Sequence, residues 1–166
     1  MIARGDLGGE WRMNSTYFNY KTLFGIIVIE SNGTSVTSIK SDISLKPTGS
    51  YAPDVLTDKA AGQLNEYFTG KRERFDVPLS PFGTDFQCLV WDALLKIPFG
   101  ETRSYKQIAQ MIGKPGACRA VGLANNRNPI WIMIPCHRVI GSDGSLTGYG
   151  GGLDMKRRLL ELESRK

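Results

Sequence analysis

The chain's only histidine directly follows a cysteine in the segment Pro135-Cys136-His137-Arg138. A cysteine thiol becomes a strong nucleophile when a base removes its proton or a nearby cation stabilises the thiolate. Neighbouring side chains on a strand point to opposite faces, so Cys136 and His137 could not touch in regular β structure. Pro135 tends to end a strand. We therefore expect a turn or a bridging water to link the thiol to the imidazole. The alternative is a buried cysteine beside an exposed histidine, with no chemistry.

The other candidate groups set limits on this chemistry. The three cysteines, Cys88, Cys118 and Cys136, are odd in number and far apart, which favours a reducing compartment over a disulfide framework. No Cys-x-x-Cys or His-x-x-x-His spacing indicates a zinc site. A histidine base needs an acceptor that fixes its tautomer. Glu161 and Glu163 are two candidates that these considerations do not rank.

Composition and charge are those of a soluble globular protein with a basic second half. Of the 166 residues, 41% are hydrophobic and 22% are charged, and no apolar run approaches the roughly 20 residues of a membrane span. Residues 1–80 carry nine Lys/Arg and nine Asp/Glu, whereas residues 81–166 carry twelve Lys/Arg and seven Asp/Glu. This asymmetry favours a polyanionic partner for the second half.

The first half predicts a small α/β domain over residues 13–80. Residues 1–12 lack the apolar core of a secretory signal, and we expect an extension that is disordered or not native to the protein. Apolar and β-branched runs predict strands, and helical spacing before Gly70 predicts one helix. The predicted strands span 16–20, 23–30, 34–40 and 75–79, and the predicted helix spans 54–68. Nothing in this half resembles a reaction centre.

The second half, residues 81–166, follows a Pro/Gly-rich linker and predicts three short helices. Two capping boxes mark the first two helix starts, Thr84 with Gln87 and Ser104 with Gln107. Pro115 suits the first position of a third helix over Gly116–Asn126. The second and third helices, joined by Gly113-Lys114, are typical of a helix-turn-helix or of an ordinary helical hairpin.

The remainder predicts short strands and a last helix. Alternating Ile130–Ile134 is typical of a half-buried strand. Residues 138–140 and 145–146 flank Gly-Ser-Asp-Gly, as in a β-hairpin or wing. Asp154 is expected to cap a helix that runs through Glu163. The predicted fold class is therefore α+β with two domains, of which the second is winged-helix-like.

Two further segments suggest a binding surface. The glycine-rich run Gly148–Gly152 lacks the pattern of a phosphate-binding loop and predicts either a substrate-facing loop or a plain linker. The predicted helix 116–126 carries small residues around one cation, Arg119. This composition fits a helix pressed into a narrow groove with the arginine as a wedge, or a helix packed tightly against a neighbouring one.

From about Phe86 to Glu163, these pieces together resemble the O6-alkylguanine-DNA alkyltransferase family. Five motifs occur in the family's order: Pro98-Phe-Gly-Glu-Thr-Arg-Ser-Tyr105, Arg119-Ala-Val-Gly122, Asn128-Pro129, Ile134-Pro-Cys-His-Arg-Val139 and Gly148-Tyr149-x-Gly-Gly-Leu153. The resemblance implies a ribonuclease-H-like α/β first domain and a winged helix-turn-helix second domain that binds the minor groove.

The resemblance also implies a single-turnover transfer. Cys136 would accept a methyl or small alkyl group from O6-alkylguanine, and by extension from O4-alkylthymine, without a cofactor. His137, oriented by Glu163, would deprotonate Cys136 through a water. Tyr105 would help rotate the nucleotide out of the helix and protonate guanine N3, while Asn128 would brace the turn that holds Cys136.

On the same basis, the partner is double-stranded DNA containing O6-alkylguanine. Arg119 would fill the gap left by the flipped nucleotide, and the other expected DNA contacts are Ser104, Tyr105, Ala120 and Gly122. The expected substrate pocket consists of Trp131, Val139, Tyr149 and Gly150. We expect a monomer, with cooperative binding to DNA left open, in the cytoplasm, or in the nucleus of a eukaryotic host.

The sequence departs from the family in three respects. Some members bind zinc in the first domain through Cys and His, but residues 1–80 contain neither, so we expect no metal. Trp131 stands where smaller residues are common, which predicts restricted access for larger adducts. Gly150 replaces a frequent serine, which leaves only backbone groups to contact guanine O6.

Two other classes of function compete with alkyl transfer. A DNA binder without activity, either a winged-helix regulator or a protein that only flags lesions, would need no reactive cysteine, whereas Cys136 is present. A regulator would also be expected to carry a dimerising element, and none is evident. In a cysteine hydrolase the dyad is usually assembled from distant residues, unlike adjacent Cys136 and His137, and no oxyanion-hole motif is evident.

Overall fold

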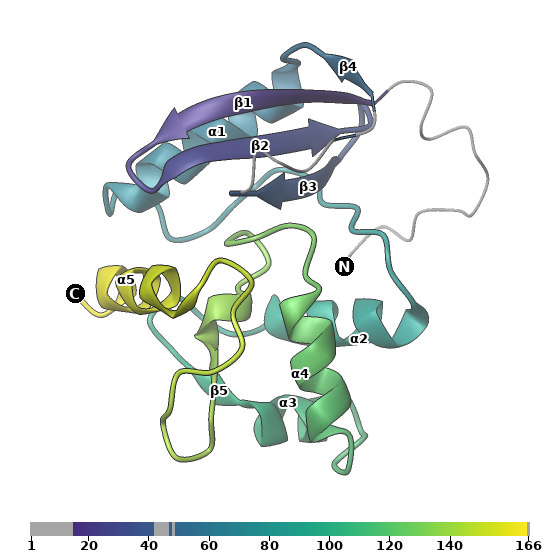
Figure 1. Ribbon diagram of the computed structural model, residues 1–166, viewed down its shortest axis with the longest axis vertical. Coiled ribbons are helices and arrows are strands. Elements are labelled where there is room, and N and C mark those ends of the chain that lie inside the picture. Colours follow the sequence, from purple (N-terminus) through teal and green to yellow (C-terminus); the bar gives the residue numbers. More distant parts are fainter. Residues whose placement is uncertain (1–14, 42–46, 48, 166) are drawn as a thin grey trace. The chain divides into compact units, whose positions relative to one another are not determined.

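The computed structural model describes residues 15–41, 47 and 49–165 (Figure 1). The chain divides into two compact units, one that ends at Phe82 and one that begins at Gly83. The expected extension, residues 1–12, lies outside the described residues. Within the described ranges, no helix is long and apolar enough to cross a membrane.

The first unit is a four-stranded sheet with one helix on it (Figure 1). Strands β1 (Thr16–Thr22), β2 (Gly25–Ser31), β3 (Val36–Lys40) and β4 (Ser50–Tyr51) lie in the order β3-β2-β1-β4. The β1–β2 and β2–β3 pairs are antiparallel, whereas β1 and β4 are parallel. Helix α1 (Val55–Phe68) packs on the sheet and supplies buried side chains to its core. The first three predicted strands and the helix are therefore present.

The predicted strand over 75–79 is wrong. The described backbone there forms only an isolated bridge, in which Leu79 pairs with Val36. Pro78 has no amide hydrogen to donate to a ladder, and the bridge consists of two bonds, from the Val36 amide to the Pro78 carbonyl and from the Ser80 amide to the Val36 carbonyl, both at 2.9 Å. The short strand β4 was not predicted from the sequence, because two exposed residues carry no periodic pattern.

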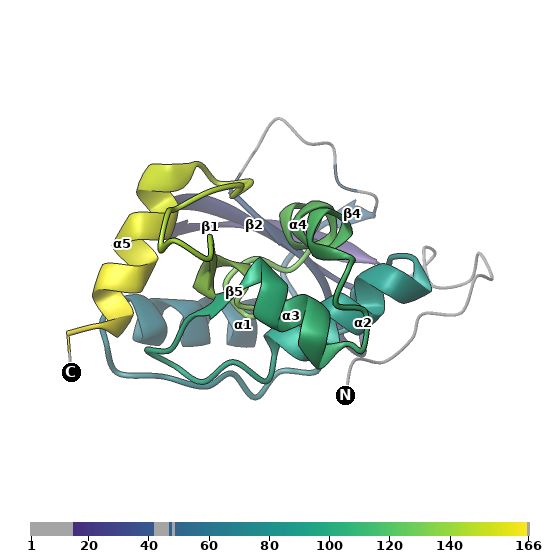
Figure 2. The same cartoon turned by 90° about the horizontal axis from the view of Figure 1, so that it is seen from below.

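The second unit is built from four helices and one pair of two-residue strands. Helices α2, α3 and α4 pack on one another, and α5 lies on the other side of the short strand pair (Figure 2). The parallel strands β5 and β6 lie between them. The bounds are α2 Asp85–Leu94, β5 Arg103–Ser104, α3 Tyr105–Met111, α4 Cys118–Asn126, the 3₁₀ turn η2 Cys136–Arg138, β6 Val139–Ile140 and α5 Leu153–Glu163.

Both predicted capping boxes are formed. The Thr84 hydroxyl accepts from the Gln87 amide, and the Gln87 side chain accepts from the Thr84 amide at 2.8 Å. Ser104 and Gln107 repeat this pair at 3.2 and 2.7 Å. The boxes satisfy amide groups that a helix start leaves without partners, so α2 and α3 begin where the sequence predicts.

Two other helix starts differ from the prediction. Pro115 lies in a turn before α4 rather than at its first position, and Ala117 is the N-cap. That turn is closed by the Ala117 amide, which donates to the Lys114 carbonyl at 2.9 Å. Asp154 does not cap α5, because Gly152 is the N-cap with φ of 84°. A left-handed cap favours glycine, and Asp154 lies in the first turn, where its charge complements the helix dipole.

Residues 130–134 form a tight turn instead of the predicted strand. Ile132 has φ of 70°, a left-handed conformation that is rare for a β-branched residue. The Asn128 side chain holds both ends of this turn, since Oδ1 accepts from the Ile130 amide at 3.0 Å and Nδ2 donates to the Ile134 carbonyl at 2.8 Å. The alternating isoleucines are all buried in the core rather than on one face of a sheet.

The predicted hairpin after residue 138 is formed only in part. Its first strand is β6, but residues 145–146 are not a strand. The Gly141 amide donates to the Ser145 carbonyl at 2.8 Å, and Asp143 accepts from the Ser145 amide at 3.0 Å. These bonds close a compact turn, and β6 pairs with β5 instead.

Candidate active site

Cys136 begins the turn η2 and is only 2% exposed. Asn128 Nδ2 donates to its sulfur at 3.1 Å, and Asn125 Nδ2 donates to its carbonyl at 3.3 Å. Burial raises the pKa of the Cys136 thiol to about 11, against the opposing effects of Asn128, Lys156 and the local backbone amides. The free protein therefore holds a protonated thiol at neutral pH, so a base is needed before the sulfur can react.

His137 is fully buried beside the carboxylate of Glu163. Its Nε2 lies 3.0 Å from Glu163 Oε1. Because a carboxylate only accepts hydrogen bonds, Nε2 carries the proton of the neutral ring and Nδ1 carries the lone pair. Burial lowers the pKa of His137, although Glu163 opposes that shift. The neutral imidazole is therefore available as a proton acceptor.

Arg138 fixes the same carboxylate from a second side. Its Nε and Nη2 lie 2.9 and 2.8 Å from the two oxygens of Glu163, and Nη1 donates to the Ile97 carbonyl at 2.7 Å. The Gly100 amide donates to Glu163 Oε2 at 3.1 Å. A buried carboxylate is stable only when its charge is compensated and its lone pairs are used. Of the two glutamates left open by the sequence, Glu163 is thus the buried partner, whereas Glu161 is exposed.

Tyr105 and Lys156 meet at one backbone carbonyl. The Tyr105 hydroxyl donates to the Thr147 carbonyl at 3.0 Å, and Lys156 Nζ donates to the same oxygen at 2.8 Å. Lys156 also donates to the Val139 carbonyl at 2.6 Å and lies 6.0 Å from the centre of the Tyr105 ring. Burial raises the pKa of Tyr105, and the charge of Cys136 raises it further.

The glycine-rich loop packs against Trp131. A methyl group built at Gly150 would lie 3.1 Å from Trp131 Cζ2, and one at Gly151 would lie 3.1 Å from Cζ3. The Tyr149 ring is centred 5.9 Å from the Trp131 ring. Trp131, Tyr149 and Gly150 of the expected pocket are therefore neighbours, and Trp131 occupies the space that a side chain at 150 would need.

The exposed face of helix α4 carries both charged and apolar side chains. Arg119 and Ala120 are exposed, as is Leu123, which is 63% exposed. Gly122 faces Tyr105, since a methyl group built there would lie 3.8 Å from the Tyr105 ring. The expected contacts of α4 thus lie on or beside an exposed face of the helix, and Ser104 lies at the N-cap of α3, the helix packed against it.

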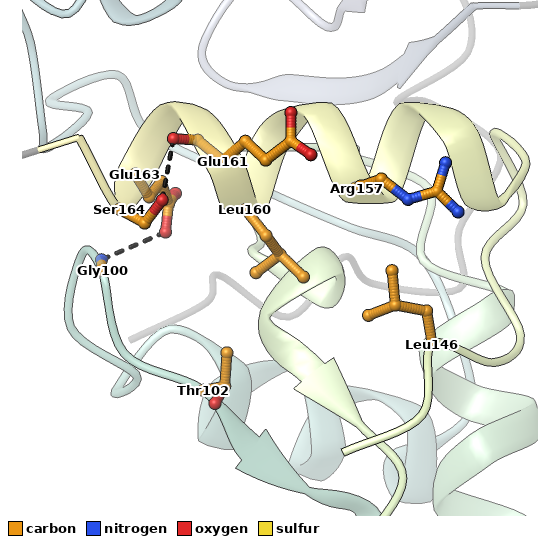
Figure 3. A pocket seen from close by; sticks show the side chains of 8 residues that line it. All are labelled: Gly100, Thr102, Leu146, Arg157, Leu160, Glu161, Glu163 and Ser164. Carbon is orange, nitrogen blue, oxygen red and sulfur yellow. Dashed lines mark hydrogen bonds between the residues drawn. The ribbon is translucent and has the colours of Figure 1, made fainter.

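A separate pocket of about 280 Å³ lies against α5 and the Gly100 turn (Figure 3). Leu146 and Leu160 supply apolar walls, and Figure 3 shows Glu163 and Ser164 at the end nearest Gly100. Cys136 does not line this pocket. The Cys136 sulfur therefore lies elsewhere, and the pocket meets the buried network at Glu163 and at Gly100, whose amide donates to that carboxylate.

Comparisons with known proteins show the family of this chain. The family model "6-O-methylguanine DNA methyltransferase, DNA binding domain" matches residues 85–165. A methylated-DNA–protein-cysteine methyltransferase of Mycobacterium bovis is 51% identical over 151 residues, which cover 87% of this chain and 92% of the relative. The chain belongs to the methylated-DNA–protein-cysteine methyltransferase family.

Other members of the methyltransferase family are similar in sequence and in structure. One from Methanosarcina barkeri is 70% identical over 105 residues, which cover 63% of this chain and 66% of that protein. The crystal structure of Mycobacterium tuberculosis OGT in complex with DNA has a TM-score of 0.83 and 50% identity, over 90% of this chain and 92% of that one. The mixed α+β fold expected from the sequence is therefore confirmed.

Within this methyltransferase, the structure adds two buried residues that the sequence analysis missed. Asn125 is 1% exposed and Lys156 is 0% exposed. Lys156 lies three and seven residues before Leu159 and Glu163, so helical spacing puts all three on one face of α5. That spacing was the available signal for Lys156, because a lysine on the apolar face of a helix requires buried acceptors.

Among the residues that the structure describes, no group of three or more His, Cys, Asp or Glu side chains is placed to hold a metal ion.

Proposed function

We propose that this chain reverses DNA damage directly, by moving a methyl or small alkyl group from O6-alkylguanine in DNA onto Cys136. The observation that carries the proposal is the buried arrangement of Cys136 beside Asn128, with His137 held by Glu163. A cysteine that served only the core would need neither a donor to its sulfur nor an oriented imidazole. The family membership supports the same reaction.

The reaction balances without a cofactor. His137 accepts the thiol proton through a water, and the Cys136 sulfur attacks the alkyl carbon as the bond from that carbon to guanine O6 breaks. Tyr105 protonates the leaving base at N3, and the proton taken from the thiol then returns to Tyr105, so that guanine gains one proton in place of the alkyl group. General acid catalysis of this kind contributes roughly 10²–10⁴-fold. The thioether product is a poor leaving group, so each molecule reacts once.

We propose further that the second unit is a winged helix-turn-helix domain that binds the minor groove. Arg119 would fill the gap in the stacked bases when the damaged nucleotide is flipped out. Its exposure on α4, with small Ala120 beside it, supports that role. The first unit would be the ribonuclease-H-like domain, with the domain boundary near residues 80–83, and the protein would act as a monomer.

The test is the intact mass of the protein after it is mixed with duplex DNA that contains one O6-methylguanine. We expect a gain of one methyl group per molecule, located on Cys136 by peptide mapping and absent in Cys136→Ser. Cys118→Ser, which removes a thiol from the same unit, should retain the gain. Binding to the lesion without a gain in mass would support a lesion-flagging protein instead.

A further inference from the structure

Lys156 is a buried amino group that takes no part in the proton and alkyl transfers proposed for Cys136, His137 and Tyr105. None of its surface is exposed, and its nitrogen donates to the Val139 and Thr147 carbonyls at 2.6 and 2.8 Å. Among the described residues, no carboxylate forms an ion pair with it; the buried carboxylate of Glu163 pairs with His137 and Arg138. Burying an ammonium without a countercharge is costly, so its retention needs an explanation.

The charges of the buried groups around Lys156 explain its retention. Arg138 and Lys156 are positive and Glu163 is negative, and all three are at most 6% exposed. While Cys136 is a thiol and His137 is neutral, the cluster carries one uncompensated positive charge. Transfer of the thiol proton to His137 leaves this net charge unchanged but creates a thiolate at Cys136. Because Glu163 pairs with His137 and Arg138, Lys156 is the cation of the cluster that is left to compensate the thiolate.

The electrostatics of the two groups agree with this count. Lys156 lowers the pKa of Cys136, and Cys136 in turn raises the pKa of Lys156. Burial, the larger effect on the lysine, lowers the pKa of Lys156 to about 8. The ammonium thus favours the thiolate up to about that pH and loses its charge above it.

Lys156 also connects the sulfur to the group that would protonate guanine. Its two acceptors lie three residues after Cys136, at Val139, and in the loop before α5, at Thr147. The second acceptor also receives the Tyr105 hydroxyl at 3.0 Å. A single amino group on α5 therefore fixes the start of β6 and the carbonyl that Tyr105 also contacts.

We propose that Lys156 is a positioning residue whose positive charge compensates the Cys136 thiolate while its hydrogen bonds hold the Thr147 carbonyl that orients Tyr105. This inference rests on the proposed transfer to Cys136. Lys156 touches neither the alkyl group nor the base, and acts through its charge and through the backbone. The titratable or charged groups that share its cluster are Cys136, His137, Arg138, Tyr105 and Glu163.

The test compares Lys156→Met and Lys156→Gln with the parent protein. Methionine removes charge and donors, whereas glutamine keeps an NH₂ donor without the charge. Lys96→Met, an exposed lysine of the same unit, is the matched control. Single-turnover transfer from O6-methylguanine DNA at pH 7.5 should slow about tenfold or more in both Lys156 variants, the effect of one pKa unit on the thiol. The dissociation constant for lesion DNA should stay at the parent value, because the buried amine does not face DNA.

A second readout needs no DNA. Methylation of Cys136 by iodomethane, followed by peptide mapping, should rise with pH in the parent and flatten above about pH 8, where Lys156 loses its charge. Both neutral variants should react about tenfold or more slowly below that pH and rise without the flattening. Parent-like rates and profiles in Lys156→Gln, with the fold verified by circular dichroism, would overturn the role of the charge. A parent protein that reacts with iodomethane but not with lesion DNA would instead refute the proposed function.

Discussion

Asn128 Nδ2 lies 3.1 Å from the Cys136 sulfur and at the same time donates to the Ile134 carbonyl at 2.8 Å. One side chain therefore shapes the turn that carries the nucleophile and supplies a donor that favours the thiolate. The pKa of Cys136 is lowered by this bond, although burial raises it overall. The Asn128 side chain thus contributes both to the stability of the turn and to the pKa of the thiol.

Replacing Asn128 should thus affect both stability and rate. Asn128→Ala leaves the buried Ile134 carbonyl without its partner, which costs about 1–3 kcal/mol in urea unfolding. Loss of the donor to sulfur should slow methyl transfer about tenfold or more. Asn128→Asp, which keeps the shape but places a carboxylate beside the sulfur, should be at least as slow. Asn65→Ala, an exposed asparagine on α1, is the control, and an Asn128→Asp variant with the parent rate would exclude the role of the donor.

Glu163 should be far more sensitive than Glu161, two residues before it on α5. Glu163→Gln leaves the buried guanidinium of Arg138 without its countercharge, and breaking a buried pair from one side costs about 3–5 kcal/mol. The amide can also turn a hydrogen-bond donor toward His137 and disturb its tautomer. We expect a lower midpoint in urea unfolding and slower transfer, with Glu161→Gln at parent values for both. Equal effects of the two substitutions would contradict the assignment.

The sequence singled out the residues of the candidate site more readily than the backbone that presents them. Cys136 and His137 are adjacent, and their motif is specific, so both could be selected without a structure. The turn over 130–134 could not be predicted from the sequence. The alternating isoleucines suggested a strand, but the Asn128 side chain bonds to the Ile134 carbonyl where a neighbouring strand would otherwise have done so. Local periodicity does not reveal such a side-chain bond to the backbone.

The burial of the charged Lys156 side chain was the other feature that could not be predicted from the sequence. Lysines are almost never fully buried unless they are paired, so the sequence analysis did not single out Lys156, although it shares a helical face with Leu159 and Glu163. The two carbonyls that accept its hydrogen bonds come from β6 and from the loop before α5. Tertiary structure alone brings them together.

Arg119 should act on DNA but not on the sulfur. Arg119→Ala should slow transfer from duplex DNA about tenfold or more even at saturating protein, because flipping a nucleotide costs a few kcal/mol that the side chain would help to offset. Methylation of Cys136 by iodomethane should be unchanged. Arg127→Ala, also exposed and at the C-cap of α4, removes the same charge and should mainly weaken binding. A smaller effect of Arg119→Ala on single-stranded substrate is expected, since no gap in a duplex remains to be filled.

Trp131 and Gly150 should behave as a coupled pair that limits the size of the adduct. Trp131→Ala should raise the ratio of benzyl to methyl transfer rates, because the indole ring packs on the glycine-rich loop of the expected pocket. Gly150→Ser alone should slow transfer, since its Cβ would lie 3.1 Å from Trp131 Cζ2, tighter than ordinary contact. Gly116→Ser, at a glycine with open space around it, is the control.

The double variant Trp131→Ala/Gly150→Ser decides whether the two residues compete for one space. If they do, Trp131→Ala relieves the crowding caused by Gly150→Ser, and the double-mutant cycle gives a coupling of about 0.5–3 kcal/mol in the free energy of activation. Serine at 150 would then also have room to donate to guanine O6, which favours methyl transfer. Additive effects, together with an unchanged benzyl-to-methyl ratio in Trp131→Ala, would show that the indole ring does not restrict the pocket.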